Sequence, residues 1–311
     1  MPTHVYTAST AWSAAISFSV QSKVLQNLRA ELVWANESLA EPGTFDKGTD
    51  LILWAKYPDL SITTPLTAIT EGTIPNSRAI TMENVTVGAL QYGDLIGLTD
   101  LSKVKAVHDV LAIATERVNR TAREVIDQTT RDAIFTGGTA FYPIGSTNAA
   151  RTDIASAEVA TGADLIKLSS LMAIGKIPKH ADGFYHLYIG PTPIYHLRKE
   201  ATSGTGFLDV WKYSDNGPII KGEIGRLHGF RIIEVNNAPT FSSTVTVHAG
   251  VATGSVKGWG VGDLTTLAVY HTPPGGQADP LHQHEFVGWI VNFGAAPLNT
   301  GYYYRYESAA S

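Results

Sequence analysis

The sequence predicts an α+β fold. One long helical pattern covers residues 100–138, strand patterns lie both before and after it, and Gly- and Pro-rich turns separate the strands. Strands are predicted at residues 49–57 and within 78–98 before the helix, and at residues 185–189, 229–235, 244–249, 265–271, 287–293 and 302–306 after it.

The N-terminal section has two parts. Residues 1–15 are rich in Thr, Ser and Ala, and we expect a mobile arm there. Residues 19–36 carry apolar side chains at helical spacing, which predicts a short amphipathic helix. That helix can dock on its own core or on a neighbouring copy. The apolar positions are Val20, Val24, Leu25, Leu28 and Leu32.

Between the arm and the long helix, the pattern predicts a projection. Residues 78–98 alternate apolar and polar side chains, which is typical of a long strand or a strand pair, and residues 49–57 form a further strand. Residues 63–76, which include Glu71-Gly72 and Pro75-Asn76, have little apolar content to pack. Two long strands joined by such a tip would project from the body and need a partner.

The long helix is predicted to begin near Thr99, Asp100 or Ser102, each able to cap it, and to end at Gly137-Gly138. No proline interrupts residues 100–138. At about 1.5 Å per residue the helix would run roughly 50 Å, so it must lie along something. The predicted packed face comprises Val104, Val107, Leu111, Ala114, Val118, Ala122 and Val125, and the predicted solvated face comprises Lys105, Asp109, Glu116, Arg117, Arg120, Arg123, Glu124, Asp127 and Arg131.

After the helix the predicted elements are shorter. A loop-rich crossing is expected over residues 139–156, a helix over 162–175, a second short helix over 193–199, and a surface loop over 201–217. Asn236-Asn237-Ala238-Pro239 predicts a turn. The apolar face of the first helix is expected to comprise Leu165, Ile166, Leu168 and Met172.

Composition excludes several classes of function. Charged residues make up 16% of the 311 residues, which indicates large protein contacts. A net charge of −5 and a pI near 6.0 argue against electrostatic binding to nucleic acid or anionic membranes as the main activity. The absence of cysteine excludes disulfides and thiolate sites. We find no membrane-spanning stretch and no signal-peptide pattern, and expect a soluble protein made in the cytoplasm.

No group of residues forms a catalytic pattern, so we expect no enzyme activity, no cofactor and no metal. The alternative is a metal site at His282 and His284, which alternate along a strand and would need His271 or Glu234 as further ligands. Gly258, Gly260 and Gly262 predict a turn or bulge, not a nucleotide-binding loop. Tyr302-Tyr303-Tyr304 with Trp289 would form either a stacking platform or a packed terminal strand, and His180 with His186 shows no site-like spacing.

Several segments carry a family resemblance. They are Thr64-Pro65-Leu66-Thr67, Glu71-Gly72, Leu90-Gln91-Tyr92-Gly93-Asp94, Leu98-Thr99-Asp100, and the stretch GEIGRLHGFRIIE at residues 222–234. Their order resembles the Hong Kong 97-type major capsid proteins of tailed bacteriophages, over about residues 43–305. The resemblance implies a Hong Kong 97-type capsid fold with an N-terminal arm, an extended β loop, a long spine helix, and peripheral and axial domains.

The resemblance also implies a division of the chain. Residues 1–48 would form the arm with its short helix, 49–98 the extended loop and a peripheral strand, 99–138 the spine helix, 139–285 mainly the axial domain, and 286–311 strands returning to the peripheral domain. The implied contacts between subunits involve Glu71, Gly72, Pro75 and Arg78. Lys47 and Lys56 lie near the region where some members form a crosslink, but no motif matches, and none is assigned.

By resemblance the protein would self-assemble into pentamers and hexamers of an icosahedral head shell that encloses phage DNA. It would be made in the host bacterial cytoplasm and end in the virion. Implied partners are further copies of the chain, a separate scaffolding protein, a portal, and packaged DNA in non-specific contact, with no membrane. The alternatives are a β-rich metal-dependent enzyme using His282 and His284, or a phage decoration or tail protein.

Overall fold

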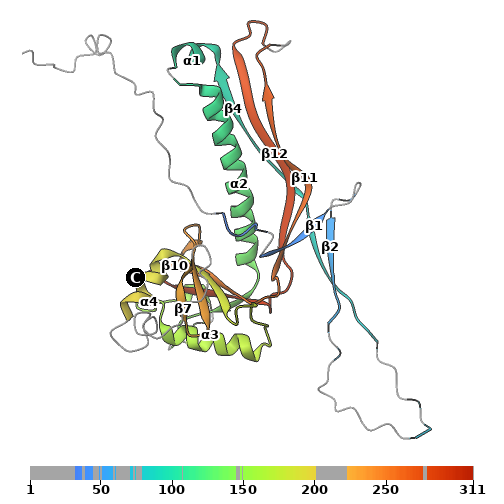
Figure 1. Cartoon of the computed structure of the whole chain (residues 1–311), viewed down its shortest axis with the longest axis vertical. Coiled ribbons are helices and arrows are strands. Elements are labelled where there is room, and N and C mark those ends of the chain that lie inside the picture. Colours follow the sequence, from blue (N-terminus) through green and yellow to red (C-terminus); the bar gives the residue numbers. More distant parts are fainter. Residues whose placement is uncertain are drawn as a thin grey trace, which may run out of the picture.

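The computed structural model describes residues 32–36, 39–44, 49, 51–58, 60, 71–72, 74, 79–106, 108–144, 148, 150–200, 223–275 and 279–310. Within these residues the chain forms two sheets, a two-stranded ribbon and one dominant helix (Figure 1), which confirms the α+β class. The predicted arm at residues 1–15, most of the predicted helix at 19–36, and the predicted loop at 201–217 lie outside the described residues.

The helices are α1 (Asp100–Lys105), α2 (Val110–Thr136), α3 (Gly162–Ile174) and α4 (Pro191–Lys199), with a 3-10 turn at Arg151–Asp153. The strands are β1 (Ala40–Thr44), β2 (Leu51–Lys56), β3 (Glu83–Gly88), β4 (Leu90–Thr99), β5 (Thr139–Phe141), β6 (Tyr185–Ile189), β7 (Glu223–Leu227), β8 (Phe230–Glu234), β9 (Thr240–Ser242), β10 (Thr246–Thr253), β11 (Trp259–Thr272), β12 (His284–Pro297) and β13 (Tyr303–Ala309).

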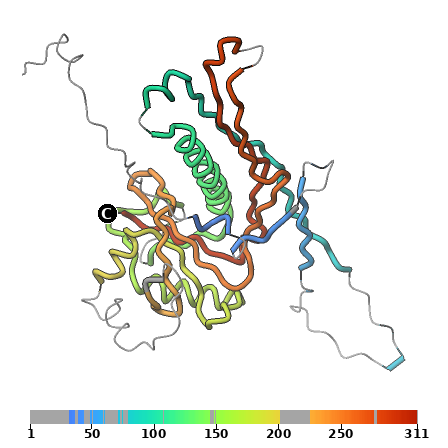
Figure 2. Tube along the Cα trace, turned by 45° about the horizontal axis from the view of Figure 1, so that its top comes forward, coloured from blue at the N-terminus to red at the C-terminus, as the bar shows by residue number. Residues whose placement is uncertain are grey.

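A four-stranded sheet runs alongside α2, in the order β1-β11-β12-β4. β1 pairs with β11 in parallel, and the other pairs are antiparallel. Figures 1 and 2 show α2 lying along one face of this long sheet. Val118 and Ala122 of α2 pack there against Val287, Trp289 and Phe293, alternate residues of β12 that share one face. The predicted requirement that the long helix lie along something is therefore met by this sheet.

The predicted helix over residues 100–138 begins and ends as expected, but it is not continuous. Thr99 caps α1 by accepting a hydrogen bond from Ser102 N, and α1 ends at Ala106, which is extended. Asp109 then caps α2 by accepting from Leu111 N and Ala112 N at 3.1 Å each. This second cap satisfies two amide groups at the start of α2, which is the local reason the helix restarts there. No residue of α1 is buried.

The two predicted faces of the helix are largely correct along α2. Ala114, Val118 and Ala122 are buried against the sheet, as predicted. Val104 does not belong to the packed face, because it lies on α1 and is 77% exposed. Asp127, predicted to face solvent, is instead 1% exposed.

Asp127 joins three parts of the chain. Its carboxylate accepts hydrogen bonds from Trp34 N at 2.7 Å, Ala35 N at 3.1 Å and Asn237 Nδ2 at 3.0 Å. Burial raises the pKa of Asp127, although these hydrogen bonds lower it. Trp34 is fully buried between Phe135 and residues of both sheets. Residues 32–36 are therefore fastened at the junction between α2 and the two sheets.

The second sheet has seven strands, in the order β5-β13-β10-β6-β8-β7, with β9 added to β10. One face packs on α3 and α4, through Leu165, Leu168 and Met172 of α3 and through Leu197 of α4. The predicted apolar face of α3 is right except at Ile166, which is 47% exposed. The other face contacts the junction around Trp34.

The strands do not divide between the sheets at residue 285 as predicted. β11, within residues 139–285, belongs to the long sheet, because it pairs with β1 and β12. β13, within residues 286–311, belongs to the seven-stranded sheet, where it lies between β5 and β10. The chain thus crosses from one sheet to the other after β10 and again after β12.

Candidate assembly interface

β2 and β3 form a separate antiparallel ribbon, paired from Leu51↔Gly88 to Lys56↔Glu83. We call it the hairpin. The predicted strands at residues 49–57 and 78–98 are confirmed by β2, β3 and β4. The hairpin leaves the long sheet at β4, because one residue separates β3 from β4, and it extends beyond the sheet (Figure 1). Lys56 and Glu83 form an ion pair at 3.6 Å across it.

The inner face of the hairpin packs on glycines of the long sheet. Val261 faces α2, so Gly260 and Gly262 of β11 face the opposite side, here called the outer face. A Cβ at Gly260 would lie 2.8 Å from Trp54 Cζ2, and one at Gly294 would lie 2.6 Å from Gly88 O. Residues without a Cβ are therefore needed where the hairpin meets the sheet. The predicted turn or bulge is wrong for Gly260 and Gly262, which lie within β11 and pair regularly with β12; Gly258 precedes β11, and the irregularity in β11 begins after Asp263.

On the other face of the hairpin, β2 presents apolar side chains that the described residues leave exposed, beside Thr86 and Asn84 of β3. Leu51 is 56% exposed and Leu53 is 53% exposed, and both lie on one face of β2 with Ala55. We call these three residues the hairpin face. Large apolar side chains exposed together mark a surface that contacts another molecule.

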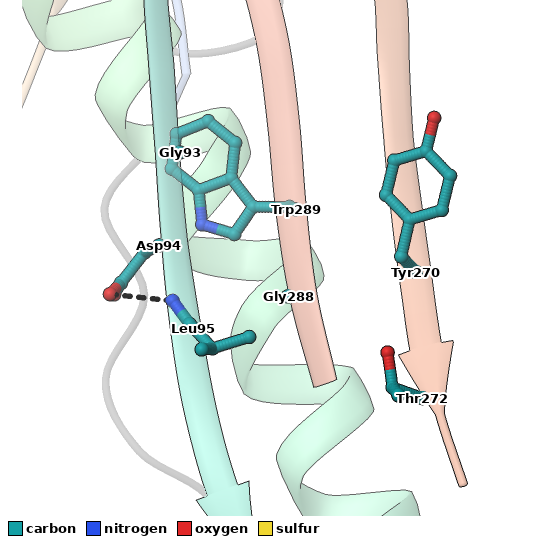
Figure 3. A pocket seen from close by; sticks show the side chains of 7 residues that line it. All are labelled: Gly93, Asp94, Leu95, Tyr270, Thr272, Gly288 and Trp289. Atoms are coloured by element: carbon teal, nitrogen blue, oxygen red, sulfur yellow. Dashed lines mark hydrogen bonds between the residues drawn. The ribbon is translucent and has the colours of Figure 1, made fainter. Parts of the chain in front are cut away.

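The outer face of the long sheet holds a hollow of about 500 Å³ beyond the hairpin (Figure 3). Gly93 of β4 and Gly288 of β12 form its floor, and Leu95 and Tyr270 rise on either side of Gly288. Leu95 and Tyr270 are each 61% exposed. We call this feature the sheet hollow. Like the region that receives the hairpin's inner face, it has glycines on the outer face of the sheet.

Two of the four predicted contact residues can be placed. Glu71 and Gly72 form an exposed turn, and Gly72 has a φ of +81°, a conformation that favours glycine. Pro75 and Arg78 lie outside the described residues. The role of all four in contacts between subunits stays a prediction.

The alternative metal site at His282 and His284 does not have the predicted strand geometry. His282 has a φ of +54° and precedes β12, so the two side chains are not alternate positions of one strand. His282 Nδ1 lies 3.2 Å from Pro274 O. His271 contacts the buried Glu285, which also pairs with Lys103 of α1, whereas Glu234 lies on the other sheet. The described residues contain no group of three or more histidine or carboxylate side chains placed to hold a metal.

Of the two interpretations of the tyrosines at residues 302–304, the structure supports the packed terminal strand. Tyr303 is fully buried and donates to Ile134 O at 2.9 Å, and Trp289 lies in the other sheet. No helix in the described part of the chain has the length and hydropathy needed to cross a membrane.

Several solved structures share this architecture over nearly the whole chain. A chain from the capsid of the cyanophage P-SCSP1u matches with a TM-score of 0.72 and 17% identity, covering 98% of this chain and 96% of that one. A capsid chain of Ralstonia phage GP4 matches with a TM-score of 0.70, 12% identity and 95% coverage of both chains. The chain has the Hong Kong 97-type capsid fold. A capsid chain of cyanophage Pam1 shares this capsid fold with a TM-score of 0.69 and 12% identity, over 99% of this chain and all of that one. No protein-family model and no curated protein matches the sequence.

Within the capsid fold, sequence reasoning missed two features. It did not identify Asp127 as a buried anchor, because its partners Trp34 and Asn237 are far away in sequence. It also dismissed His180 and His186, whose rings stack with centroids 3.7 Å apart. No spacing rule would have brought the second pair together, since one histidine lies in a turn and the other in a strand.

Proposed function

We propose that this protein is the major capsid protein of a tailed bacteriophage. Copies of the chain would assemble as pentamers and hexamers into an icosahedral head shell around the genome. The observation that carries the proposal is the shared fold over nearly the full length of both chains in each comparison. A match confined to one sheet would support much less, because small sheet-and-helix units recur in unrelated proteins.

Two surfaces with apolar side chains that the described residues leave exposed support repeated contacts between copies. The hairpin face carries Leu51 and Leu53, and the sheet hollow is bordered by Leu95 and Tyr270. These are different surfaces on one subunit, so a contact between them is head-to-tail, and such contacts close into rings when the rotation allows it. Burial of one leucine side chain contributes about 1.5–3 kcal/mol. We propose that the hairpin face of one copy covers the sheet hollow of the next.

The proposal extends to location and partners. The shell protein would be made in the host bacterial cytoplasm and be found in the virion. A separate scaffolding protein and a portal would take part in assembly. A net charge of −5 favours loose, non-specific contact with packaged DNA.

The test replaces Leu53 with aspartate. Leu53 is 53% exposed, so Leu53→Asp should leave the subunit folded and soluble. Negative-stain electron microscopy of the expressed protein should show closed shells for the wild type and none for the variant, since the new charge would be buried at each contact. Leu53→Met is the matched control, because it keeps an apolar side chain of similar volume, and it should still form shells.

Three other outcomes of these experiments would favour different conclusions. Shells from Leu53→Asp would reject the hairpin contact while leaving the shell function standing. Tubes or small rings from the wild type, both alone and with the products needed for head assembly, would favour a tail or decoration protein. Stoichiometric metal that is lost on changing His282 or His284 would favour the metal-dependent alternative.

A further inference from the structure

The His180–His186 stack lies on the seven-stranded sheet, outside the assembly surfaces. His186 is on β6, and His180 belongs to the turn at residues 178–184 that precedes it. The two imidazole rings are nearly parallel, at 10°, with centroids 3.7 Å apart. His186 is 8% exposed, and His180 Nε2 is buried with no hydrogen-bond partner. Such a pair places two titratable groups face to face with little water.

The carboxylate of Asp182 contacts this cluster. Asp182 Oδ2 lies 2.9 Å from His186 Nε2 and 2.9 Å from Arg231 Nη1, and Asp182 Oδ1 accepts from Phe184 N at 3.0 Å. Burial alone would raise the pKa of Asp182, but the hydrogen bonds from His186 and Phe184 and the charge of Arg231 hold it below its ordinary value. The carboxylate is therefore already shared between a guanidinium and an imidazole.

Burial disfavours a proton on His180. Burial, together with the neighbouring His186, lowers the pKa of His180 to about 4, while Asp182 and a hydrogen bond to Thr253 oppose the shift. The charged and titratable groups that contact the stack or act on His180 are Asp182 of the turn, Tyr188 of β6 and Arg231 of β8. Arg226 of β7 lies opposite Arg231 in the strand register and over the Phe184 ring, and Lys179 lies over Tyr185 on the opposite face of the sheet. The positive charge of Arg231 disfavours a proton on His180, whereas Asp182 favours one.

The turn that carries His180 also holds a crossing between the two sheets. Residues 254–258 lead from β10 of the seven-stranded sheet to β11 of the long sheet. Pro178 O accepts a hydrogen bond from Ser255 N at 2.9 Å, and a Cβ at Gly254 would meet Ile177 and Pro178. The second crossing contacts the first, because Gly258 O accepts from Leu298 N at 2.9 Å. Loss of the turn would thus loosen the region where the chain passes between sheets.

We propose that the His180–His186 stack is an acid-sensitive clamp on the crossing at residues 254–258. At neutral pH a neutral His180 stacks on His186 and keeps the turn against the crossing. Because the folded-state pKa of His180 lies below the ordinary histidine value near 6.5, this stabilisation is complete above about pH 6.5 and is lost as the pH falls toward about 4. Protonation would release the turn and free Ser255 N. The inference does not depend on the proposed shell function.

The experiment measures amide hydrogen exchange of the full-length subunit at about pH 7 and about pH 5, corrected for intrinsic exchange rates. In the wild type, peptides covering Gly183, Phe184 and Ser255 should lose about tenfold in protection at the lower pH. His180→Phe keeps a flat ring but cannot be protonated, so its protection should change by less than about twofold. His284→Phe is the control, because His284 is an exposed histidine of the other sheet, and it should behave as the wild type.

Two results would overturn the clamp. One is equal protection at both pH values in the wild type. The other is an equal loss of protection in His180→Phe. If His180→Phe does not fold, histidine NMR of the wild type decides the matter: a His180 that titrates near 6.5 rejects the proposal, and one that titrates well below supports it.

Discussion

Replacement of Arg151 by methionine should strongly destabilise the subunit. Glu307 on β13 is completely buried, and Arg151 binds it with two hydrogen bonds of 2.7 Å, from Nε and from Nη2. The guanidinium also lies 3.6 Å above the Phe241 ring. In Arg151→Met the carboxylate would keep the 3.6 Å contact with Arg305 but lose both short hydrogen bonds. Removing one partner of a buried pair costs about 3–5 kcal/mol, a large share of the stability of a single domain.

A double-mutant cycle tests whether the broken Arg151–Glu307 pair causes the loss of stability. Glu307→Gln should cost less, about 1–2 kcal/mol, because the Arg151 side chain is 28% exposed and can reach water. Arg151→Met combined with Glu307→Leu removes both charges and should lie within about 2 kcal/mol of the wild type. Urea unfolding of the soluble subunit, followed by circular dichroism, measures each variant. A cost below about 1 kcal/mol for Arg151→Met, or a double variant as unstable as Arg151→Met, would refute the reasoning.

Two further predictions concern the hairpin. Replacing Glu71-Gly72 and Pro75 together with serines should leave a soluble, folded subunit that no longer forms closed particles in electron micrographs. Normal shells would show that these residues do not make an essential contact between subunits. Gly260→Val should displace Trp54, because a Cβ at Gly260 would lie 2.8 Å from its ring, and should cost about 1–3 kcal/mol. Thermal unfolding measures the cost, and a melting temperature equal to that of the wild type would show that the ring moves aside freely.

Local signals predicted most elements of the fold. Gly137-Gly138 marks the end of α2, the apolar spacing of Leu165, Leu168 and Met172 marks α3, and stretches rich in aromatic and aliphatic residues became β6 and β8. These signals depend on nearby residues, so they can be read without the rest of the chain. The resemblance in motif order then predicted the architecture, which the comparisons confirm.

The misses share a physical cause. The apolar repeat continues on both sides of residue 109, so periodicity alone joins α1 to α2, while the cap made by the Asp109 side chain separates them. Asp127 lies on a charged helical face, yet amide donors from distant segments compensate its burial. The sequence around Gly260 predicts a turn, and only the structure shows that Trp54 of another strand covers this glycine. The surfaces between subunits are harder still, because their partner is a second molecule.

The position of β13 also sets the timing of folding. β13 follows every other described strand in the sequence, yet it lies between β5 and β10 in the interior of its sheet. β12, also late in the chain, is likewise an inner strand of the long sheet, between β11 and β4. Neither sheet can complete its pairing before these late strands have been synthesised. The hairpin strands β2 and β3 pair with each other and come early in the chain, whereas the sheet hollow needs β12, so the two assembly surfaces form at different stages of synthesis.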